Sequence, residues 1–581
     1  MSDSTVYVFV FYSPVFCMTN PVTDPGEPAE VHAAGVRPFC LRSKIVAGLV
    51  ALGVLVVALA ARWLLVSSPL HMDEYNYLFV GRLFHLGESW PTLTYIFGAD
   101  FNWRLLGWAY SISNTPESAR FIAAVAGLFS LIAVYMMVYV VWKSRLRAIV
   151  TIMLFALMAP HIYISSLATY DIVAFCLFCW GMVFLWSLML SEPIPKFVSD
   201  IDDISLISSM RRRSRILLIC TAVLIVAAVL SKYVLILYLP CLLFVVLLYK
   251  PRYALPAMLM VGGLLSIYAW QARESLMVLY QTQILITQSA NINRFELFKR
   301  FSYLLCWTVV LLAFVNILNF GLRRIPAWRS LLADSMGGSN ITESLKPKFL
   351  FLMLALPLPV YHLASSNQIA SIKHLNYFYL FALPLVACAI VDIAKGARAY
   401  LHQAKSAENR PWLGLSSVSL VLVVVGGLAA QLVVSNLRIA ADLSKGFPDI
   451  SAAADYWQKS RLDKNNSGRI LSEDPYLFRF AALPDFPQAL ISETTFLDNN
   501  QDGEYTSQDV KDAIWDHKFK WVLLTDQIHP QENRLYRRLL LLRGYEAVVR
   551  QPYSLTPLLT GNRNGVVELY QLRNNVLADA N

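Results

Sequence analysis

Long apolar runs recur from residue 45 to residue 435, and short charged connections separate them. A transmembrane helix needs about 20 mostly apolar residues, because the hydrocarbon core of a bilayer is about 30 Å thick. Hydrophobic residues make up 57% of the chain and charged residues only 15%, whereas soluble domains carry about 25% charged residues. We therefore predict an α-helical polytopic membrane protein with about eleven transmembrane helices, at residues 45–66, 119–142, 147–160, 171–190, 215–231, 234–249, 254–270, 301–320, 348–364, 375–394 and 413–435.

Basic residues gather in alternate connections between these runs. Cytoplasmic loops carry an excess of Lys and Arg, so we predict that these connections and the N-terminus lie in the cytoplasm, beneath a plasma (bacterial inner) membrane. The loop after the first span, residues 271–300 and the C-terminal region then face outward. The basic residues are Lys143, Arg145 and Arg147; Arg211, Arg212, Arg213 and Arg215; Lys250 and Arg252; Arg323, Arg324, Arg329, Lys346 and Lys348; and Lys395, Arg398, Lys405 and Arg410.

The net charge of +10 is unevenly distributed along the chain. Residues 437–581 contain 17 basic and 19 acidic residues, a charge of −2, so residues 1–436 carry +12. Basic cytoplasmic loops account for that excess, and we expect no nucleic-acid partner. The sequence also contains no glycine-rich phosphate loop, so we expect no nucleotide site.

The composition divides the chain into three regions. Residues 1–43 are predicted to be a disordered cytoplasmic N-terminus in which Met18 is a candidate start, and residues 44–436 are predicted to form the transmembrane domain. Residues 437–581 alternate strand-like runs (468–472, 520–525 and 565–572) with polar helical stretches such as 508–516 and 531–543, which predicts a soluble extracytoplasmic α/β domain. None of the eight cysteines follows Cys388, so we expect no disulfide in that domain. Cys176 and Cys179 lie in an apolar run, which indicates a buried pair rather than a redox or zinc site.

The stretch at residues 68–90, SPLHMDEYNYLFVGRLFHLGESW, opens the first outer loop (68–118) with two adjacent carboxylates, Asp73 and Glu74. Neighbouring residues on a helix point about 100° apart, so the two cannot act as a matched pair on one substrate atom. One is a candidate general base or metal ligand, while the other orients a side chain or caps the helix. The alternative is that both only cap the helix. We interpret the loop as an active site that faces the lipid headgroups.

Further charged residues lie at the predicted outer ends of spans. Asp171 stands between two apolar runs, and Lys232 interrupts the run AAVLSKYVLILYLP at an outer turn. Ionisable residues within membrane segments are functional candidates, although Asp171 could be a helix cap and each cation an interface anchor. As a set, the cations could bind a lipid-linked phosphate. The other cationic candidates are Arg82, Arg104, Arg273, Lys373 and His374.

Four motifs, in order, resemble those of the membrane glycosyltransferases with the C-type fold. This group includes the protein O-mannosyltransferases and the lipid A aminoarabinose transferases. The sequence departs from their pattern in three places: FGADFNWRLLGW stands where a His/Lys-Pro-Pro element is usual, His374 replaces a late arginine, and Tyr233 follows Lys232 in place of Gly-Pro. The motifs, which cover roughly residues 45–395, are HMDEYNYLFVGR, SSLATYDIVAF, AAVLSKYVLILYLP and LNYFYLFALPLVACAI.

The resemblance implies transfer of a sugar from a polyprenyl-phosphate carrier to a hydroxyl of a glycan, lipid or protein, with inversion. It implies that Asp73 is the base, that Lys232 and nearby arginines stabilise the departing phosphate, and that Asp171 positions the acceptor or the loop. A divalent cation at the active site is a further expectation. A transporter or flippase of lipid-linked saccharide, or a non-catalytic subunit of a polysaccharide assembly machine, is the alternative. The charges gather at one membrane face rather than along a passage, which favours an enzyme.

Residues 498–509, DNNQDGEYTSQD, fit a calcium-loop pattern. Its spacing resembles the EF-hand loop, in which oxygen ligands occupy alternate positions before a turn glycine and a last acidic residue. Asp replaces the usual Glu at the last position. An acidic turn on a solvated surface is the alternative. The predicted calcium ligands are Asp498, Asn500, Asp502, Glu504 and Asp509.

Overall fold

The computed structural model describes the larger part of the helical region and of the C-terminal region. The described residues are 49, 52–60, 62, 74, 77–78, 81, 101–113, 116–191, 201–273, 276–277, 307–318, 341–365, 371–406, 411–443, 448–461, 468–473, 491–493, 497, 506–526, 530–555 and 563–573.

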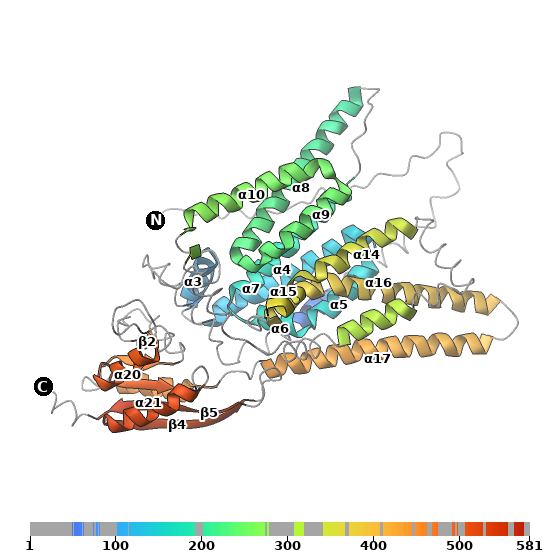
Figure 1. Ribbon diagram of the computed structural model, residues 1–581. Coiled ribbons are helices and arrows are strands. Elements are labelled where there is room, and N and C mark those ends of the chain that lie inside the picture. Colours follow the sequence, from blue (N-terminus) through green and yellow to red (C-terminus); the bar gives the residue numbers. More distant parts are fainter. Residues whose placement is uncertain are drawn as a thin grey trace, which may run out of the picture. The chain divides into compact units, whose positions relative to one another are not determined.

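Residues 101–443 are helical wherever they are described, apart from short connections (Figure 1). The apolar runs form helices because backbone N–H and C=O groups must bond within the segment when no water is present. The elements are α3 (Phe101–Ser113), α4 (Pro116–Trp142), α5 (Arg145–Ala156), α6 (Ala159–Ser166), α7 (Tyr170–Met189), α8 (Ile201–Ser231), η2 (Tyr233–Tyr238), α9 (Leu239–Tyr249), η3 (Pro251–Tyr253), α10 (Ala254–Gln271), α14 (Ile341–Ala355), α15 (Pro357–Ser365), α16 (Ser371–Ser406) and α17 (Pro411–Leu443).

Seven helices in the described part of the chain are long and apolar enough to cross a membrane, which supports a polytopic membrane protein. An eighth is added if the bent pair α5 and α6 counts as one span. Residues 45–66 and 301–320 are described only in part, so the total of about eleven spans stays a prediction. The seven are Pro116–Trp142, Tyr170–Met189, Ser208–Ser231, Pro251–Gln271, Lys346–Ala364, Ile372–Arg398 and Val423–Ala441.

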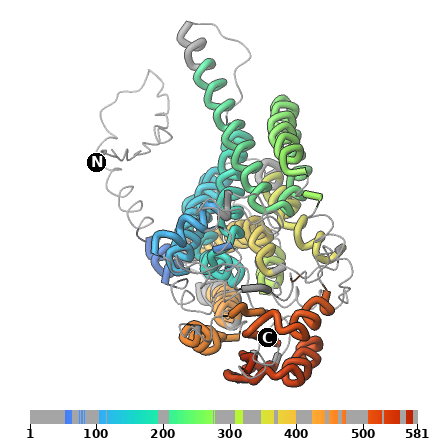
Figure 2. Tube along the Cα trace, turned by 90° about the vertical axis from the view of Figure 1, so that its left-hand side faces the viewer, coloured from blue at the N-terminus to red at the C-terminus, as the bar shows by residue number. Residues whose placement is uncertain are grey.

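The central helix of this region is α16. In its most apolar 18-residue stretch, 89% of the residues are buried, whereas in the corresponding stretch of α10 only 6% are buried. α16 packs against α5, α6, α14, α15 and α17, and α4 and α7 pack against each other. α10 lies beside α8 in both views and packs on α8 and α9 (Figure 1 and Figure 2). The site described below therefore lies among the most buried helices.

The predicted run at residues 147–160 is a broken helix. α5 ends at Ala156 and α6 begins at Ala159, with a bend of 66° between them. Pro160 lies in the first turn of α6. An N–H group in that turn has no partner within the helix, so proline loses no helical hydrogen bond there. The side chain of Asn436, on α17, accepts a hydrogen bond from Ala159 N at 2.9 Å. A distant helix thus satisfies a backbone donor that would otherwise be unpaired in the bundle.

The C-terminal residues form a five-stranded mixed sheet of order β2-β1-β3-β5-β4. β1 pairs parallel with β2 and β3, and the other pairs are antiparallel. Figure 1 shows β4 and β5 as a long hairpin. The elements are α18 (Ser451–Arg461), β1 (Ile470–Ser472), β2 (Ile491–Glu493), α20 (Ser507–Trp515), β3 (Trp521–Leu524), α21 (Pro530–Leu542), β4 (Tyr545–Leu555) and β5 (Arg563–Leu572).

Alternation along β3 distributes its side chains over both faces of the sheet. Trp521 and Leu523 share a buried cluster with Trp457 of α18. Val522 and Leu524 share another cluster with residues of α20 and α21. Successive side chains of a strand point to opposite faces, so this sheet has helices on both sides.

We predict that replacing Asn436 by Leu destabilises the helical region. The change leaves the Ala159 N–H buried without an acceptor, which costs about 1–3 kcal/mol. The temperature of unfolding in detergent should therefore fall. Asn316→Leu is the matched control, because Asn316 is exposed on its helix and such positions change stability by about 0.5 kcal/mol or less. Equal effects of the two substitutions would refute a capping role for Asn436.

Candidate active site

Asp171, Lys232 and Lys373 meet in the helical region although they come from three different elements. Asp171 lies in the first turn of α7, Lys232 directly follows α8, and Lys373 lies in the first turn of α16. Lys232 Nζ donates a hydrogen bond to Asp171 Oδ1, and Lys373 Nζ lies 3.1 Å from Asp171 Oδ2. The sequence predicted all three as site residues, and the structure brings them together.

Local structure explains why each charge lies at this point. Lys232 has extended backbone angles (φ −147°, ψ 98°), so α8 ends there and η2 begins. Its Nζ lies 5.4 Å from the centre of the Tyr170 ring, a favourable cation–π contact. Thr169, before α7, donates its hydroxyl to Asp171 Oδ2 at 3.1 Å. These charged groups therefore lie at helix ends, where the apolar runs stop.

Asp171 holds two buried ammonium groups close together. The side chains of Asp171, Lys232 and Lys373 are only 2%, 5% and 10% exposed, and Asp171 contacts both lysines. Removing a charge from water costs several kcal/mol unless partners compensate it. Two ammonium groups at one place could both donate hydrogen bonds to a phosphate group.

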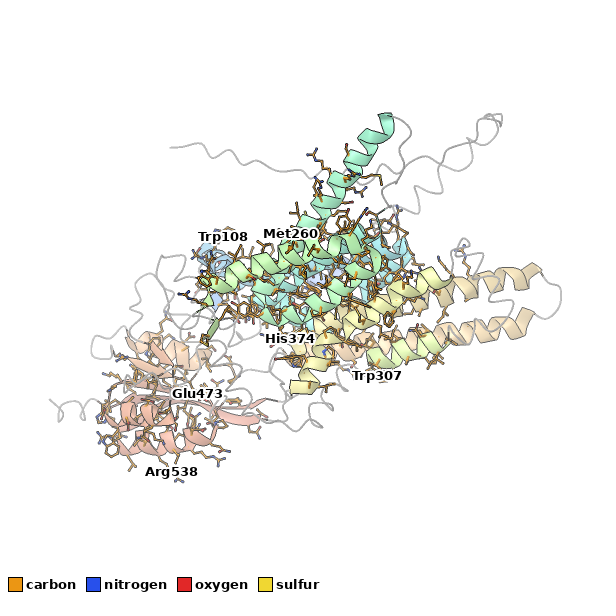
Figure 3. The ribbon with its side chains drawn as sticks, turned by 45° about the horizontal axis from the view of Figure 1, so that its top comes forward. Trp108, Met260, Trp307, His374, Glu473 and Arg538 are labelled. Atoms are coloured by element: carbon orange, nitrogen blue, oxygen red, sulfur yellow. The ribbon has the colours of Figure 1, made fainter. Side chains whose placement is uncertain are left out.

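His374 follows Lys373 on α16 and is labelled in Figure 3. Its Nδ1 lies 2.7 Å from Nε2 of His362, which projects from α15, and both rings are buried. His374 was predicted as a site residue. His362 was not, because a single histidine in the apolar stretch PLPVYHLAS carries no positional signal.

Glu74 forms a second buried ion pair, with Arg120 of α4. Arg120 donates to both carboxylate oxygens, from Nε at 2.8 Å and from Nη2 at 2.7 Å. Ala168 N donates to Glu74 Oε1 at 2.7 Å. The two side chains are 0% and 1% exposed, so their charges balance without water. Glu74 thereby holds the segment that lies three residues before Asp171. Sequence reasoning missed Arg120, which stands at the start of an apolar run.

Of the other predicted site residues, only some belong to the part of the chain that the structure describes. Asp73 and Arg82 lie outside the described residues, and so do Asp498, Asn500, Asp502 and Glu504. Arg104 is exposed on α3. Asp509 is buried and caps α20: its carboxylate accepts from Thr506 N at 3.0 Å, while its own N–H bonds the Thr506 hydroxyl. Among the residues with described positions, no group of three His, Cys, Asp or Glu could hold a metal ion. The metal sites stay predictions.

Comparison with known proteins gives one family match and several similar structures. Residues 70–323 match the family of dolichyl-phosphate-mannose-protein mannosyltransferases. No curated protein matches the sequence. ArnT from Cupriavidus metallidurans in the apo state is similar in structure, with a TM-score of 0.50 and 13% identity over 93% of this chain and 99% of that one. The motifs, the helical region and this similarity agree on the C-type glycosyltransferase fold.

Two further structures are similar. ArnT from Cupriavidus metallidurans bound to undecaprenyl phosphate has a TM-score of 0.49 and 12% identity, over 92% of this chain and 98% of that one. The Archaeoglobus fulgidus oligosaccharyltransferase AglB, in complex with an inhibitory peptide and a dolichol-phosphate, has a TM-score of 0.47 and 12% identity. That match covers 88% of this chain and 74% of AglB.

We predict that breaking the Glu74–Arg120 pair on one side destabilises the protein strongly. Glu74→Leu or Arg120→Leu leaves a buried charge without its partner, which costs about 3–5 kcal/mol. The double variant E74L/R120L should recover most of this loss, because replacing a buried pair by apolar residues is often neutral. Unfolding temperatures in detergent measure both effects, with Arg104→Leu as an exposed control. A double variant as unstable as the sum of the single ones would contradict the pairing.

Proposed function

We propose that this protein is a membrane glycosyltransferase that takes its sugar from a polyprenyl-phosphate carrier, a proposal supported by the match of residues 70–323 to the family of dolichyl-phosphate-mannose-protein mannosyltransferases. The acceptor is a hydroxyl group of a glycan, a lipid or a protein. The reaction takes place at the outer face of the plasma membrane, on the side to which the C-terminal domain is predicted to project. The observation that carries the proposal is the meeting of two buried ammonium groups, those of Lys232 and Lys373, at the carboxylate of Asp171.

In the proposed reaction, Asp73 takes the proton from the acceptor hydroxyl as its oxygen attacks the anomeric carbon. The new C–O bond forms while the bond from that carbon to the phosphate oxygen breaks, with inversion at carbon. The bonding electron pair leaves with the polyprenyl phosphate. Lys232 and Lys373 stabilise this developing negative charge, as positioned cations do for other departing phosphates.

Asp171 has a separate task in this scheme. Its carboxylate accepts contacts from both lysines through different oxygens. It therefore holds the two ammonium groups a short distance apart before the carrier arrives. Preorganised charges need no rearrangement during the reaction, and this is the main source of their effect. Glu74 accepts a hydrogen bond from Ala168 N and so helps to fix the backbone that leads to Asp171.

We predict that Asp73→Asn abolishes sugar transfer while the protein still folds and inserts into the membrane. Lys232→Met and Lys373→Met should each lower kcat by about 10²–10³, the usual loss when one group that stabilises developing charge is removed. Transfer of radiolabelled sugar from a polyprenyl-phosphate carrier by the purified protein measures this. Lys250→Met is the matched control, because Lys250 donates to Ser191 O at the far end of α9. Near-normal transfer by D73N would remove Asp73 from the role of base.

Metal binding is a further part of the proposal. A divalent cation near Asp73 is expected from the resemblance, and calcium is expected at residues 498–509. Extracellular calcium modules bind with Kd of about 10⁻⁴–10⁻³ M, so a site on an outward domain can fill at that strength. Isothermal titration of the full-length protein with calcium should show binding that D498N/D502N removes. Identical heats for the two proteins would dismiss the calcium loop.

A further inference from the structure

The histidine pair beside the lysine cluster has one feature that the proposed reaction does not use. His362 Nε2 and His374 Nδ1 lie 2.7 Å apart, with ring centres at 4.9 Å, and the two residues are 1% and 6% exposed. At this distance a hydrogen atom must lie between the two nitrogens, because two bare acceptors would repel each other. One ring is therefore the donor and the other the acceptor.

Burial and the neighbouring lysines disfavour an imidazolium at this pair. Both rings are buried, and Lys232 and Lys373 are near His374, while the carboxylate of Asp171 acts in the opposite direction. A positive charge on His374 would be costly without water and close to two ammonium groups. The two rings then share a single hydrogen at their contact. The tautomer of each ring is set by the bond that its other nitrogen makes.

Only one of the two arrangements suits an anionic ligand. If His362 Nε2–H donates, His374 Nδ1 accepts, and the hydrogen of His374 lies on Nε2, on the side of the ring away from His362. If His374 donates instead, its Nε2 is an acceptor and repels a phosphate oxygen. Phosphate oxygens accept hydrogen bonds, so a bound phosphate favours the first arrangement.

We propose that His362 is a positioning residue that holds His374 as the Nε2–H tautomer, so that His374 donates a hydrogen bond to the carrier phosphate beside Lys232 and Lys373. This inference rests on the proposed function and deepens it. It also gives His374 a role at the position where the resembling enzymes have an arginine. A neutral donor replaces a cation there, and two lysines already supply the charge.

Three substitutions of His362 separate this role from simple packing. His362→Gln places an amide N–H₂ near the position of Nε2, so it can still donate to His374. His362→Asn is one methylene shorter and cannot reach, and His362→Leu fills the space without a donor. The measurement is the Kd of the full-length protein for decaprenyl phosphate in detergent, with decaprenol as the ligand that lacks phosphate.

We expect the affinity for decaprenyl phosphate to fall in H362L and H362N and to be retained in H362Q. H362L and H362N should weaken decaprenyl phosphate binding about tenfold, as expected when a hydrogen bond to a charged group is lost, and H362Q should stay within about threefold. Decaprenol binding should not change. In the H374L background, H362L should have no further effect, because positions that act through one contact are not additive.

Several outcomes would overturn the inference. Unchanged binding by H362L, a loss in H362Q equal to that in H362N, or an additive loss in H362L/H374L would each exclude the positioning role. If H362L does not fold, the comparison of H362Q with H362N decides. Wild-type protein that binds decaprenyl phosphate no better than decaprenol would refute the proposed function itself. If the wild-type protein prefers decaprenyl phosphate but the His362 variants do not differ as expected, the positioning role of His362 is refuted and the proposed function is not.

Discussion

The contact of the Asp171 carboxylate with two lysines is the interaction on which the arrangement of the candidate site depends. The carboxylate reaches Lys232 after α8 and Lys373 in α16, so one side chain joins three elements of the helical region. A buried ammonium without a partner costs several kcal/mol. The carboxylate of Asp171 offsets part of that cost for both lysines and holds their ammonium groups close together.

The contrast with Glu74 shows why balance matters. Glu74 meets one guanidinium in a two-pronged contact and also accepts from Ala168 N, so its lone pairs and its charge are both satisfied. This ion pair joins the segment at Glu74 to α4 and to Ala168. Asp171 and Glu74 are both acidic residues beside apolar runs in the sequence. Their partners distinguish them, because Glu74 meets a guanidinium and a backbone N–H, whereas Asp171 meets two ammonium groups.

Much of the fold could be predicted, because hydropathy and charge act locally. The apolar runs are helices wherever they are described, and Asp171, Lys232 and Lys373 lie at helix ends, as the interrupted runs indicated. Strands β1, β3 and β5 also coincide with the runs singled out by pattern. β4 was not predicted, because its charges and Pro552 weaken the strand signal. Arg120, His362 and Asn436 were missed because each lies in or beside an apolar run, and no spacing along the chain relates it to its partner.

The sequence by itself determined which segments are apolar enough to form buried helices and which charged groups lie at the ends of these segments. These properties depend on neighbouring residues, so they can be read along the chain. Only the tertiary structure decided which charges meet. Asp171 could have met Arg120, and Glu74 could have met Lys232; the packing of α4, α7, α8 and α16 set the pairs. Helix packing depends on the shapes of whole surfaces far apart in the chain, and hydropathy does not encode those shapes.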